Sequence, residues 1–399
     1  MPFVTAFTLC QVSQDAALEA LQLRGTDDPV PGYPTARLLI PVNVNGTQIR
    51  LRFHNSSARY RGTVRHCTLA KCSENGILIP DTVRDVTVNR ESSFTLLPGQ
   101  GEASDVLPFS VSVGDWLALS VYCSELPPSS NSIYPIQLQS PLGDHCLNDF
   151  ENCDSVSAIR EQGVEMFPAV PLFSALEIDT EHSPAIVACL GDSITQQGFW
   201  YVPLMKRLYQ CYPGKICLLN YGVGGNRLLK DTEPEFMGGF GRALLNRIQD
   251  EAFQRLRATH AIIAIGVNDL IHGGSMDPNP SPSPEQFARG CCQLAEILHR
   301  AGMKTMAYTI YPSTLEFPQL EGQAPERSAQ LEPLFHAYNR AIRSAGFERI
   351  VELQPILGFT DRLGYQDGFV QQDGLHLNEM GGRKLADTIE LDWFMEDKS

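Results

Sequence analysis

A serine, an aspartate and a histidine in the second half of the chain have the spacing and surroundings needed for acyl transfer. Ser193 follows a glycine turn and precedes a helical pattern, so its hydroxyl can be exposed and its N–H can face an anion. A serine hydroxyl is a weak nucleophile without a base, and the imidazole of His376 can take its proton and return it to a leaving alcohol. Asp373, three residues before this histidine, can bind the other ring nitrogen and stabilise the imidazolium.

Three groups could stabilise the oxyanion that forms during acyl transfer. They are the backbone N–H of Ser193, the backbone N–H of Gly225 and the side-chain amide of Asn268, each of which follows an apolar run. Loss of one such donor slows other enzymes by roughly 10²–10³-fold. The spacing leaves open by one position whether Gly224 or Gly225 faces the oxyanion.

Each of these residues also has a purely structural interpretation. Ser193 could only cap a helix, Asn268 could belong to a strand-end turn, and His376 could be a surface histidine. Four such motifs at places that can converge are far more specific than any one of them. The combination therefore favours catalysis.

The neighbours of these motifs are given other roles. Asp192 is expected to bind turn amides, and Asp269 is expected to be structural. Arg227, just after the glycine loop, either binds substrate or pairs with an acid. His272, a few residues past Asn268, is expected at the rim of the substrate pocket. We take Arg227 and His272 as the candidate substrate-binding residues.

No metal site and no cofactor are expected. Two groups of histidine and cysteine have spacings that suit structural zinc poorly: His66, Cys67 and Cys72, and His145, Cys146 and Cys153. The glycines at 222–225 do not have the spacing of a phosphate-binding loop. Most of the 11 cysteines lie in apolar runs, which is typical of reduced thiols in a cytosolic protein.

The elements that must position these motifs follow from the alternation of apolar runs with amphipathic stretches. From residue 185 onward the runs are 185–190, 215–222, 260–266, 304–310 and 349–353. Continuous apolar runs separated by helical patterns are typical of buried parallel strands. We therefore predict a doubly wound α/β domain over 181–399 with a mainly parallel, five-stranded sheet. Sites in such sheets form beyond the carboxyl ends of the strands, where the motifs lie.

The first 180 residues have a different pattern. Residues 30 to about 145 contain short alternating runs, which predict an all-β sandwich or jelly roll. Asn45-Gly46 between two such runs predicts a hairpin with a type I′ turn. Residues 146 to about 184 lose the pattern and are expected to be a connecting segment. We place the domain boundary near residue 180.

Composition excludes some partners. The net charge of −15 argues against nucleic acid, which is bound by clustered lysine and arginine. No apolar run approaches the roughly 20 residues of a membrane helix, and the start lacks the basic residues of a signal peptide. We expect a cytoplasmic protein without membrane contact. The oligomeric state cannot be predicted.

The four motifs GDSIT, NYGVGGN, GVND and DGLH resemble the four signature blocks of the SGNH (GDSL-type) hydrolases. The resemblance covers residues 185 to about 395 and implies a flavodoxin-like, three-layer α/β/α fold. It implies that Ser193 is the nucleophile, that Gly225 and Asn268 are oxyanion donors, and that Asp373 and His376 complete a catalytic triad.

Within that family the sequence looks most like bacterial acyl esterases, some of which carry a β-sandwich before the catalytic domain. The resemblance implies a serine esterase that cuts short acyl esters, chiefly acetyl, on a small molecule or an oligosaccharide. Two alternatives stay open. One is a lysophospholipase or thioesterase activity, and the other is a non-catalytic protein whose β domain binds a glycan.

Overall fold

The computed structural model describes most of the chain. The described residues are 1–13, 15, 30–31, 35–126, 129–130, 132–139, 170, 172–232, 239–273, 277, 279–311, 324–357, 368–371 and 373–396. They form two compact units. The β unit is Met1–Pro184 with short segments of the second half, chiefly Tyr209–Leu219, and the α/β unit is most of the chain from Ala185 onward.

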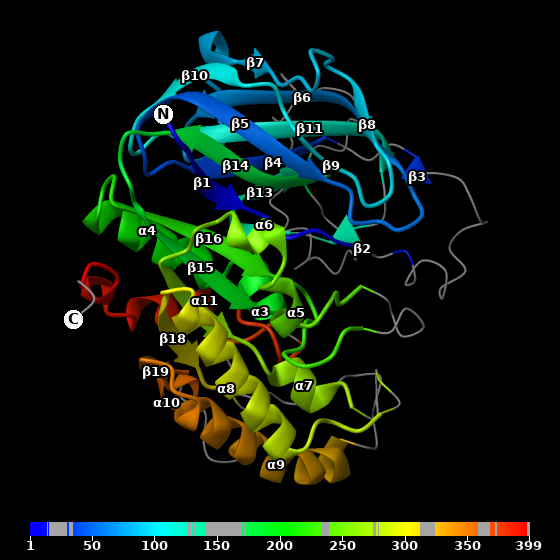
Figure 1. Ribbon diagram of the computed structural model, residues 1–399, viewed down its shortest axis with the longest axis vertical. Helices are drawn as coiled ribbons and strands as arrows, with labels where there is room; N and C mark the ends of the chain where they lie inside the picture. The colour runs from blue at the N-terminus through cyan, green and yellow to red at the C-terminus, as the bar shows by residue number, and fades with distance from the viewer. Residues whose placement is uncertain are drawn as a thin grey trace. The chain divides into compact units, whose positions relative to one another are not determined.

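The β unit contains two large antiparallel sheets and one small one (Figure 1). The five-stranded sheet has the order β1 (Phe3–Thr8), β14 (Phe173–Asp179), β5 (Gly46–His54) and β10 (Leu107–Val111), with β9 (Gly101–Ala103) also paired to β5. The seven-stranded sheet has the order β13 (Gln137–Gln139), β4 (Ala36–Pro41), β11 (Trp116–Leu126), β6 (Gly62–Cys72) and β7 (Arg84–Asp85), with β3 (Val30–Pro31) on β11 and β8 (Phe94–Leu96) on β6. The small sheet pairs β2 (Val12–Ser13) with β12 (Ser129–Ser130), and two short 3-10 helices, η1 (Pro80–Thr82) and η2 (Tyr134–Ile136), complete the unit.

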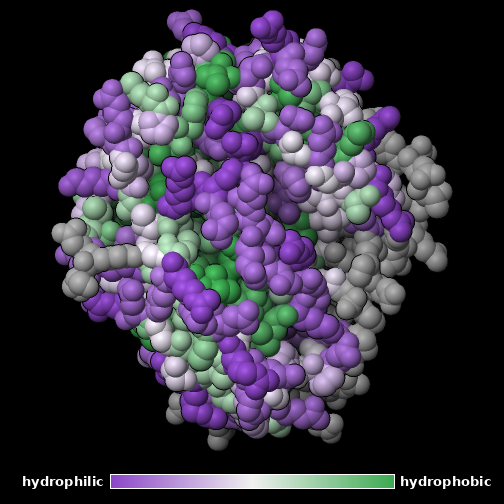
Figure 2. Space-filling model, viewed as in Figure 1, coloured by the Kyte–Doolittle hydropathy of each residue, from purple (hydrophilic) through white to green (hydrophobic). Residues whose placement is uncertain are grey.

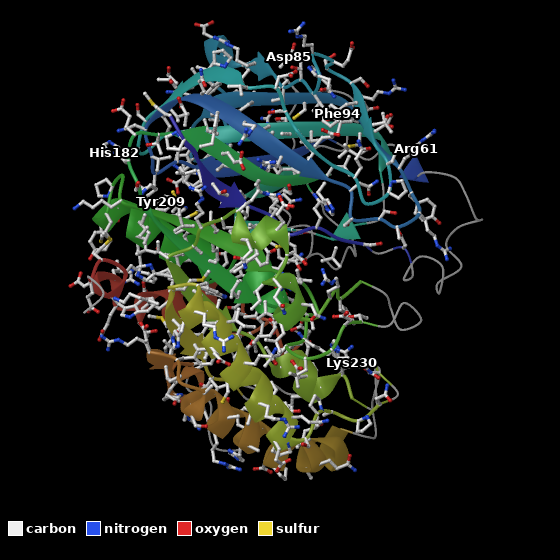
Figure 3. All side chains as sticks on the ribbon, in the orientation of Figure 1. Arg61, Asp85, Phe94, His182, Tyr209 and Lys230 are labelled. Carbon is white, nitrogen blue, oxygen red and sulfur yellow. The ribbon has the colours of Figure 1, made fainter. Side chains whose placement is uncertain are left out.

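Alternating burial explains why these strands form a layered core. In β5 the side chains of Ile49, Leu51 and Phe53 are buried, and the residues between them are not. This period of two is the mark of a sheet with one face turned to a core. Phe53 packs edge-to-face against Phe94 of the other sheet, with ring centroids 5.0 Å apart (Figure 3). The predicted all-β N-terminal region is therefore present.

The predicted hairpin at Asn45-Gly46 is wrong. The strands on either side of it, β4 and β5, belong to different sheets. Neither Asn45 nor Gly46 has the positive φ that a type I′ turn requires. The side-chain oxygen of Asn45 instead accepts a hydrogen bond from the N–H of Val113, at 2.9 Å. Burial of the two strands in separate sheets outweighs the local turn preference.

The expected connecting segment also needs correction, because it contains a central strand. β14 lies between β1 and β5 in the five-stranded sheet, and both pairings are antiparallel. Leu176 and Ile178 are buried on the core side of this strand. Its partners are far away in the sequence, so no local turn marks the strand.

The α/β unit contains the predicted five-stranded parallel sheet. Its order is β16 (Ile216–Gly222), β15 (Ala185–Gly191), β17 (His260–Ala264), β18 (Lys304–Tyr308) and β19 (Arg349–Val351). The first strand in sequence lies second in space, which gives the 2-1-3-4-5 order of flavodoxin-like folds. In such sheets ligands bind where the winding direction reverses, here between β15 and β17.

The helices of this unit follow the strands in sequence (Figure 1). They are α3 (Ser193–Gln196), α4 (Tyr201–Cys211), α5 (Leu244–Arg247), α6 (Glu251–Gln254), α7 (Val267–Ile271), α8 (Pro284–Arg300), α9 (Ala324–Ser344), α10 (Leu353–Ile356), α11 (Glu379–Asp387) and the 3-10 helix η4 (Leu391–Phe394). The N-terminal end of α8 is fixed by its own sequence. Ser283 and Gln286 form a capping box there, and Pro284 occupies the first turn.

On the face shown in Figure 2, hydrophilic side chains predominate and hydrophobic ones show only as small patches. The large apolar side chains that are exposed come from loops, from the ends of the described chain and from the start of α11: Met1, Ile77, Ile79, Leu97, Val106, Met380 and Met395. Among the helices that the structure describes, none has the length and apolar character needed to cross a bilayer.

Candidate active site

Ser193 is the first residue of α3 and directly follows the turn after β15. Asp192 caps this short helix, because its side chain accepts a hydrogen bond from the N–H of Ile194 at 3.0 Å. Within the described residues no acceptor is found for the N–H of Ser193. The turn thus presents a hydroxyl and a backbone donor from one residue.

The side chains of Ser193, His376 and Asp373 form one chain of hydrogen bonds. Nε2 of His376 lies 2.8 Å from Oγ of Ser193, and Nδ1 of His376 lies 2.6 Å from Oδ2 of Asp373. Burial raises the pKa of Asp373, but the bonds and charge of His376 outweigh burial and hold this pKa well below its usual range. Asp373 is therefore ionised and can orient the ring of His376.

The turn that carries the histidine is fixed by its own residues. Oδ1 of Asp373 accepts the backbone N–H groups of Leu375 at 2.9 Å and of His376 at 3.0 Å. The N–H of Gln371 donates to the carbonyl of His376 at 2.7 Å. The side-chain amide of Gln371 also donates to Oε1 of Gln197, at 3.0 Å. This last bond joins the histidine turn to the residue that ends α3.

The glycine loop after β16 is bound to α3. Nδ2 of Asn220 donates to the carbonyl of Thr195 at 2.9 Å, and the N–H of Gly224 donates to Oε1 of Gln196. The N–H of Gly224 is thus occupied. For the N–H of Gly225, the described residues contain no acceptor. This difference favours Gly225 over Gly224 as the free donor.

Only glycine fits at position 225. Its φ is +68°, a region that other L-residues rarely adopt. A Cβ placed there would lie 1.9 Å from the ring of Phe240. Close packing of an aromatic ring against the backbone therefore sets the shape of this loop.

The third motif follows β17 and binds the glycine loop. Nδ2 of Asn268 donates to the carbonyl of Asn226 at 3.1 Å, which leaves the second proton of this amide for another acceptor. The carboxylate of Asp269 accepts the N–H groups of Leu228 at 2.7 Å and Leu229 at 3.2 Å. Asp269 thus holds the backbone of the loop.

The carboxyl groups of Asp192 and Asp269 are fully buried. Burial raises the pKa of Asp192 to about 7, and the charge of Asp269 adds to this against the opposing bond from Ile194. Burial also raises the pKa of Asp269 to about 6, although the N–H groups of Leu228 and Leu229 oppose it. Both side chains bind backbone amides, which the sequence suggested for Asp192 and which fits the structural role expected of Asp269.

Arg227 is buried and pairs with an acid, which is the second alternative that the sequence left open. Its guanidinium lies 2.6 Å from Oδ2 of Asp277 and also donates to the carbonyl of Asp231 at 2.8 Å. Lys230, which Figure 3 marks on the same loop, binds the same carboxylate at 2.7 Å. Arg227 therefore joins the glycine loop to the segment after α7.

His272 is buried and does not lie at an exposed rim. Its ring packs against that of Phe240, with centroids 4.9 Å apart. Burial and the charge of Arg227 lower the pKa of His272 to about 4, with Asp277 opposing. His272 is neutral at pH 7 and supports the ring that packs on Gly225.

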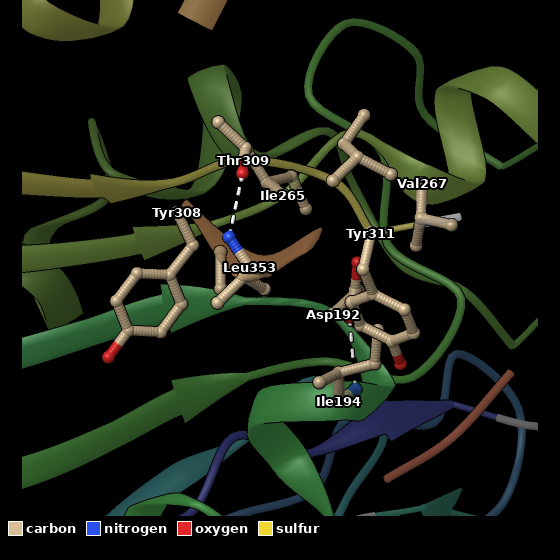
Figure 4. Close-up of a pocket in the computed structure, with 10 residues that line it drawn as sticks. Asp192, Ile194, Ile265, Val267, Tyr308, Thr309, Tyr311 and Leu353 are labelled. Carbon is tan, nitrogen blue, oxygen red and sulfur yellow. Dashed lines mark hydrogen bonds between the residues drawn. The ribbon is translucent and has the colours of Figure 1, made fainter. Parts of the chain in front are cut away.

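A small cavity of about 30 Å³ lies beside the turn that carries Ser193 (Figure 4). Asp192 and Ile194 line it from the turn, Val267 lines it from α7, and Tyr308 and Tyr311 line it from β18 and the segment after it. One water molecule needs at least ~10–15 Å³ of such a cavity, so this cavity holds no more than a few waters. It is too small to be the substrate pocket by itself.

The two groups of histidine and cysteine that were compared with zinc sites show no metal-site geometry in the described residues. Nε2 of His66 lies 3.0 Å from Oδ1 of Asp85. The second group, His145, Cys146 and Cys153, lies outside the described residues. In the part of the chain that the structure describes, no three histidine, cysteine or acidic side chains gather as a metal site would require.

Several residues that shape the site could not be singled out from the sequence. Gln371, Gln197, Phe240 and Tyr311 act through contacts with residues distant in the chain. None belongs to a motif with a chemical signature. The one local signal was the position of Gln371 and Gln197 near the histidine and serine motifs.

The segment that carries these residues is similar to one family of known proteins. Residues 189–384 match the GDSL-like lipase/acylhydrolase family. This segment contains all four motifs and every residue of the hydrogen-bond chain. No curated protein sequence matches the chain.

Several solved structures are similar to part of this chain at low identity. An acetyl xylan esterase is 18% identical, with 52% of this chain and 98% of that chain covered and a TM-score of 0.34. A psychrotrophic esterase from Pseudoalteromonas sp. is 18% identical, with 51% and 92% covered and a TM-score of 0.34. A GDSL-like lipase from Bacteroides thetaiotaomicron is 17% identical, with 51% and 84% covered and a TM-score of 0.34.

The match over residues 189–384 and the parallel sheet that carries the four motifs lead to one conclusion. Over residues 189–384 the chain is similar to the GDSL-like lipase/acylhydrolase family, and this segment has the fold and the motifs of a carboxylic ester hydrolase.

Proposed function

We propose that the chain is a serine esterase that hydrolyses short acyl esters, chiefly acetyl esters of carbohydrates, through an acyl-enzyme on Ser193. The observation that carries the proposal is the chain of two short hydrogen bonds from Oγ of Ser193 through His376 to Asp373. A nucleophile, a base and a group that orients the base are the parts that acyl transfer needs.

In the first half of the reaction, Oγ of Ser193 attacks the ester carbonyl while Nε2 of His376 takes its proton. The tetrahedral oxyanion accepts hydrogen bonds from the N–H of Ser193, the N–H of Gly225 and Nδ2 of Asn268. His376 then gives the proton to the leaving alcohol, and the acyl group stays on Ser193. Asp373 remains ionised and stabilises the imidazolium.

In the second half, water takes the place of the alcohol. His376 removes a proton from the water as its oxygen attacks the acyl-enzyme carbonyl. The same three donors stabilise the second oxyanion. Collapse returns the proton to Oγ of Ser193 and releases the carboxylic acid, so that the balance is one ester and one water to one acid and one alcohol.

The proposed substrate and the proposed roles of the two domains have separate grounds. The preference for acetyl groups on carbohydrate rests on the resemblance to esterases that carry a β-sandwich before the catalytic part. We propose that residues 1–180 are an accessory domain and that 181–399 are catalytic. Arg227 and His272 are buried and hold the glycine loop. We therefore propose that they shape the wall of the substrate site without binding substrate directly.

The proposal is tested with p-nitrophenyl esters and the variant Ser193→Ala. The wild-type chain should hydrolyse p-nitrophenyl acetate, and Ser193→Ala should lose on the order of 10³-fold or more in kcat. An equal rate for both proteins would contradict the proposal. A series of acyl lengths beside acetylated saccharides tests the substrate, and a preference for long chains would favour a lysophospholipase or thioesterase.

A further inference from the structure

We propose that Tyr311 is a positioning residue for the general base, because its hydroxyl holds the peptide unit that carries His376 into hydrogen-bond reach of Ser193. The inference rests on the proposed function, in which His376 is the base. Tyr311 lies outside the four motifs, and it follows β18 on a different part of the sheet from the serine and histidine turns.

The contact that motivates the proposal is a single hydrogen bond. The hydroxyl of Tyr311 donates to the backbone carbonyl of Leu375, and the side chain is buried. Leu375 directly precedes His376 in the sequence. Figure 4 shows Tyr311 beside Asp192, at the cavity next to the nucleophile turn. The tyrosine thus stands between the two turns that carry the reacting groups.

Tyr311 holds one end of a rigid unit whose other end is held by Asp373. The carbonyl of Leu375 and the N–H of His376 belong to the same peptide group, which is planar. Tyr311 binds the oxygen of this group, and Oδ1 of Asp373 accepts its N–H at 3.0 Å. With both ends held, the plane cannot rotate, and the direction in which the side chain of His376 leaves the backbone is fixed.

The hydroxyl keeps its proton under all working conditions. Burial raises the pKa of Tyr311 well above its usual range, and the nearby charges of Asp192 and Asp373 add to this effect. A carbonyl can only accept, so a protonated phenol is what the contact requires. The bond to Leu375 therefore persists wherever the triad works.

Loss of the Tyr311 hydroxyl should allow the peptide group between Leu375 and His376 to move, while the packing of the ring is kept. Tyr311→Phe keeps the ring and removes one donor. Since small displacements of a reacting group can cost up to ~10²-fold in rate, we expect kcat to fall roughly 10- to 100-fold while KM changes less than about twofold. A merely structural role would instead leave kcat per folded molecule unchanged.

A matched control is available in the same unit. The hydroxyl of Tyr338 donates to the carbonyl of Pro282 at 2.7 Å, so Tyr338→Phe also removes a phenol donor from a backbone carbonyl. Both variants should lose a similar, small amount of stability, as is typical when one hydrogen bond is removed. Only Tyr311→Phe should lose kcat. Equal kcat losses in the two variants, or none in Tyr311→Phe, would overturn the proposal.

A double-mutant cycle separates this proposal from the proposed function. Hydrolysis of p-nitrophenyl acetate is measured in wild type, Tyr311→Phe, His376→Ala and the double variant, at high enzyme concentration and with the folded fraction determined. If Tyr311 acts through His376, its substitution has no further effect once the histidine is gone. An equal loss in both backgrounds would overturn the positioning role, whereas full activity in His376→Ala would overturn the proposed function itself.

Discussion

The carboxylate of Asp277 pairs with both cationic side chains beside the glycine loop, those of Arg227 and Lys230. Its side chain is 6% exposed and accepts from Arg227, which is 7% exposed, and from Lys230. Burial raises the pKa of Asp277, but the bonds from Lys230 and Arg227 outweigh it and hold the pKa well below the usual 3.8. Removing one partner of such a buried pair leaves an uncompensated charge inside the protein.

The first prediction concerns Asp277→Asn. The variant should lose about 3–5 kcal/mol of the free energy of unfolding at pH 7, measured by urea denaturation. Because the folded pKa is depressed, the contribution of Asp277 is fully present above pH 3.8 and is lost as the pH falls through the folded value. The difference between variant and wild type should therefore shrink below pH 3.8.

An exposed ion pair provides the control for this prediction. Asp250 binds Arg242 at 2.8 Å, but their side chains are 41% and 56% exposed. Asp250→Asn should cost less than about 1 kcal/mol at pH 7, since exposed pairs contribute little. An equal loss of unfolding free energy in the two variants would show that the buried pairs of Asp277 contribute no more to stability than an exposed pair.

At the scale of elements, contacts from several parts of the α/β unit fix the conformation of the glycine loop after β16. It is bound to α3 through Asn220 and Gly224, and to the third motif through Asn268 and Asp269. Phe240 packs on it at Gly225. The position of the proposed oxyanion donor thus depends on contacts from several elements.

Gly225→Ala should damage this loop in two ways. The added methyl collides with Phe240, and alanine disfavours the φ of +68°. We expect kcat for p-nitrophenyl acetate to fall by roughly 10²–10³-fold, as when an oxyanion donor is lost. Gly99→Ala is the matched control, because Gly99 has a φ of +72° and nothing within 4 Å of the added methyl. It should lose stability only, and a similar kcat loss there would contradict the argument.

The parallel sheet could be predicted because its strands are continuous apolar runs, a pattern that burial on both faces imposes. The hairpin at Asn45-Gly46 could not be excluded from sequence, because the sheet to which β4 and β5 belong is decided by distant partners. β14 was missed for the same reason. Ser193, Asp373 and His376 could be singled out because they lie in short polar motifs at strand ends. Tyr311 could not, since its contact with Leu375 exists only in the folded chain.

At the scale of the whole molecule, one buried asparagine links distant segments within the β unit. Nδ2 of Asn43 donates to the carbonyls of Tyr212 at 3.0 Å and Ile216 at 2.8 Å, and its Oδ1 accepts the N–H of Gly214 at 3.0 Å. These partners lie about 170 residues further along the chain, from the segment after α4 to the first residue of β16. Asn43 therefore holds the segment that leads from α4 into β16.

Asn43→Ala should destabilise the folded chain by roughly 2–3 kcal/mol, because it leaves buried backbone groups without partners. Urea denaturation followed by circular dichroism measures the loss. Asn45→Ala, two residues further on at an exposed position, removes one hydrogen bond and should cost less than about 1 kcal/mol. A negligible loss in Asn43→Ala would show that the link is unimportant.

The most direct test of the central claim is to trap the nucleophile. A p-nitrophenyl alkylphosphonate should react with the wild-type chain, release one p-nitrophenol per molecule and leave a phosphonyl group that tandem mass spectrometry locates on Ser193. Ser193→Ala should carry no adduct, and His376→Ala should react far more slowly because Oγ lacks its base. An adduct on another residue, or ester hydrolysis that continues with Ser193 unmodified, would contradict the account.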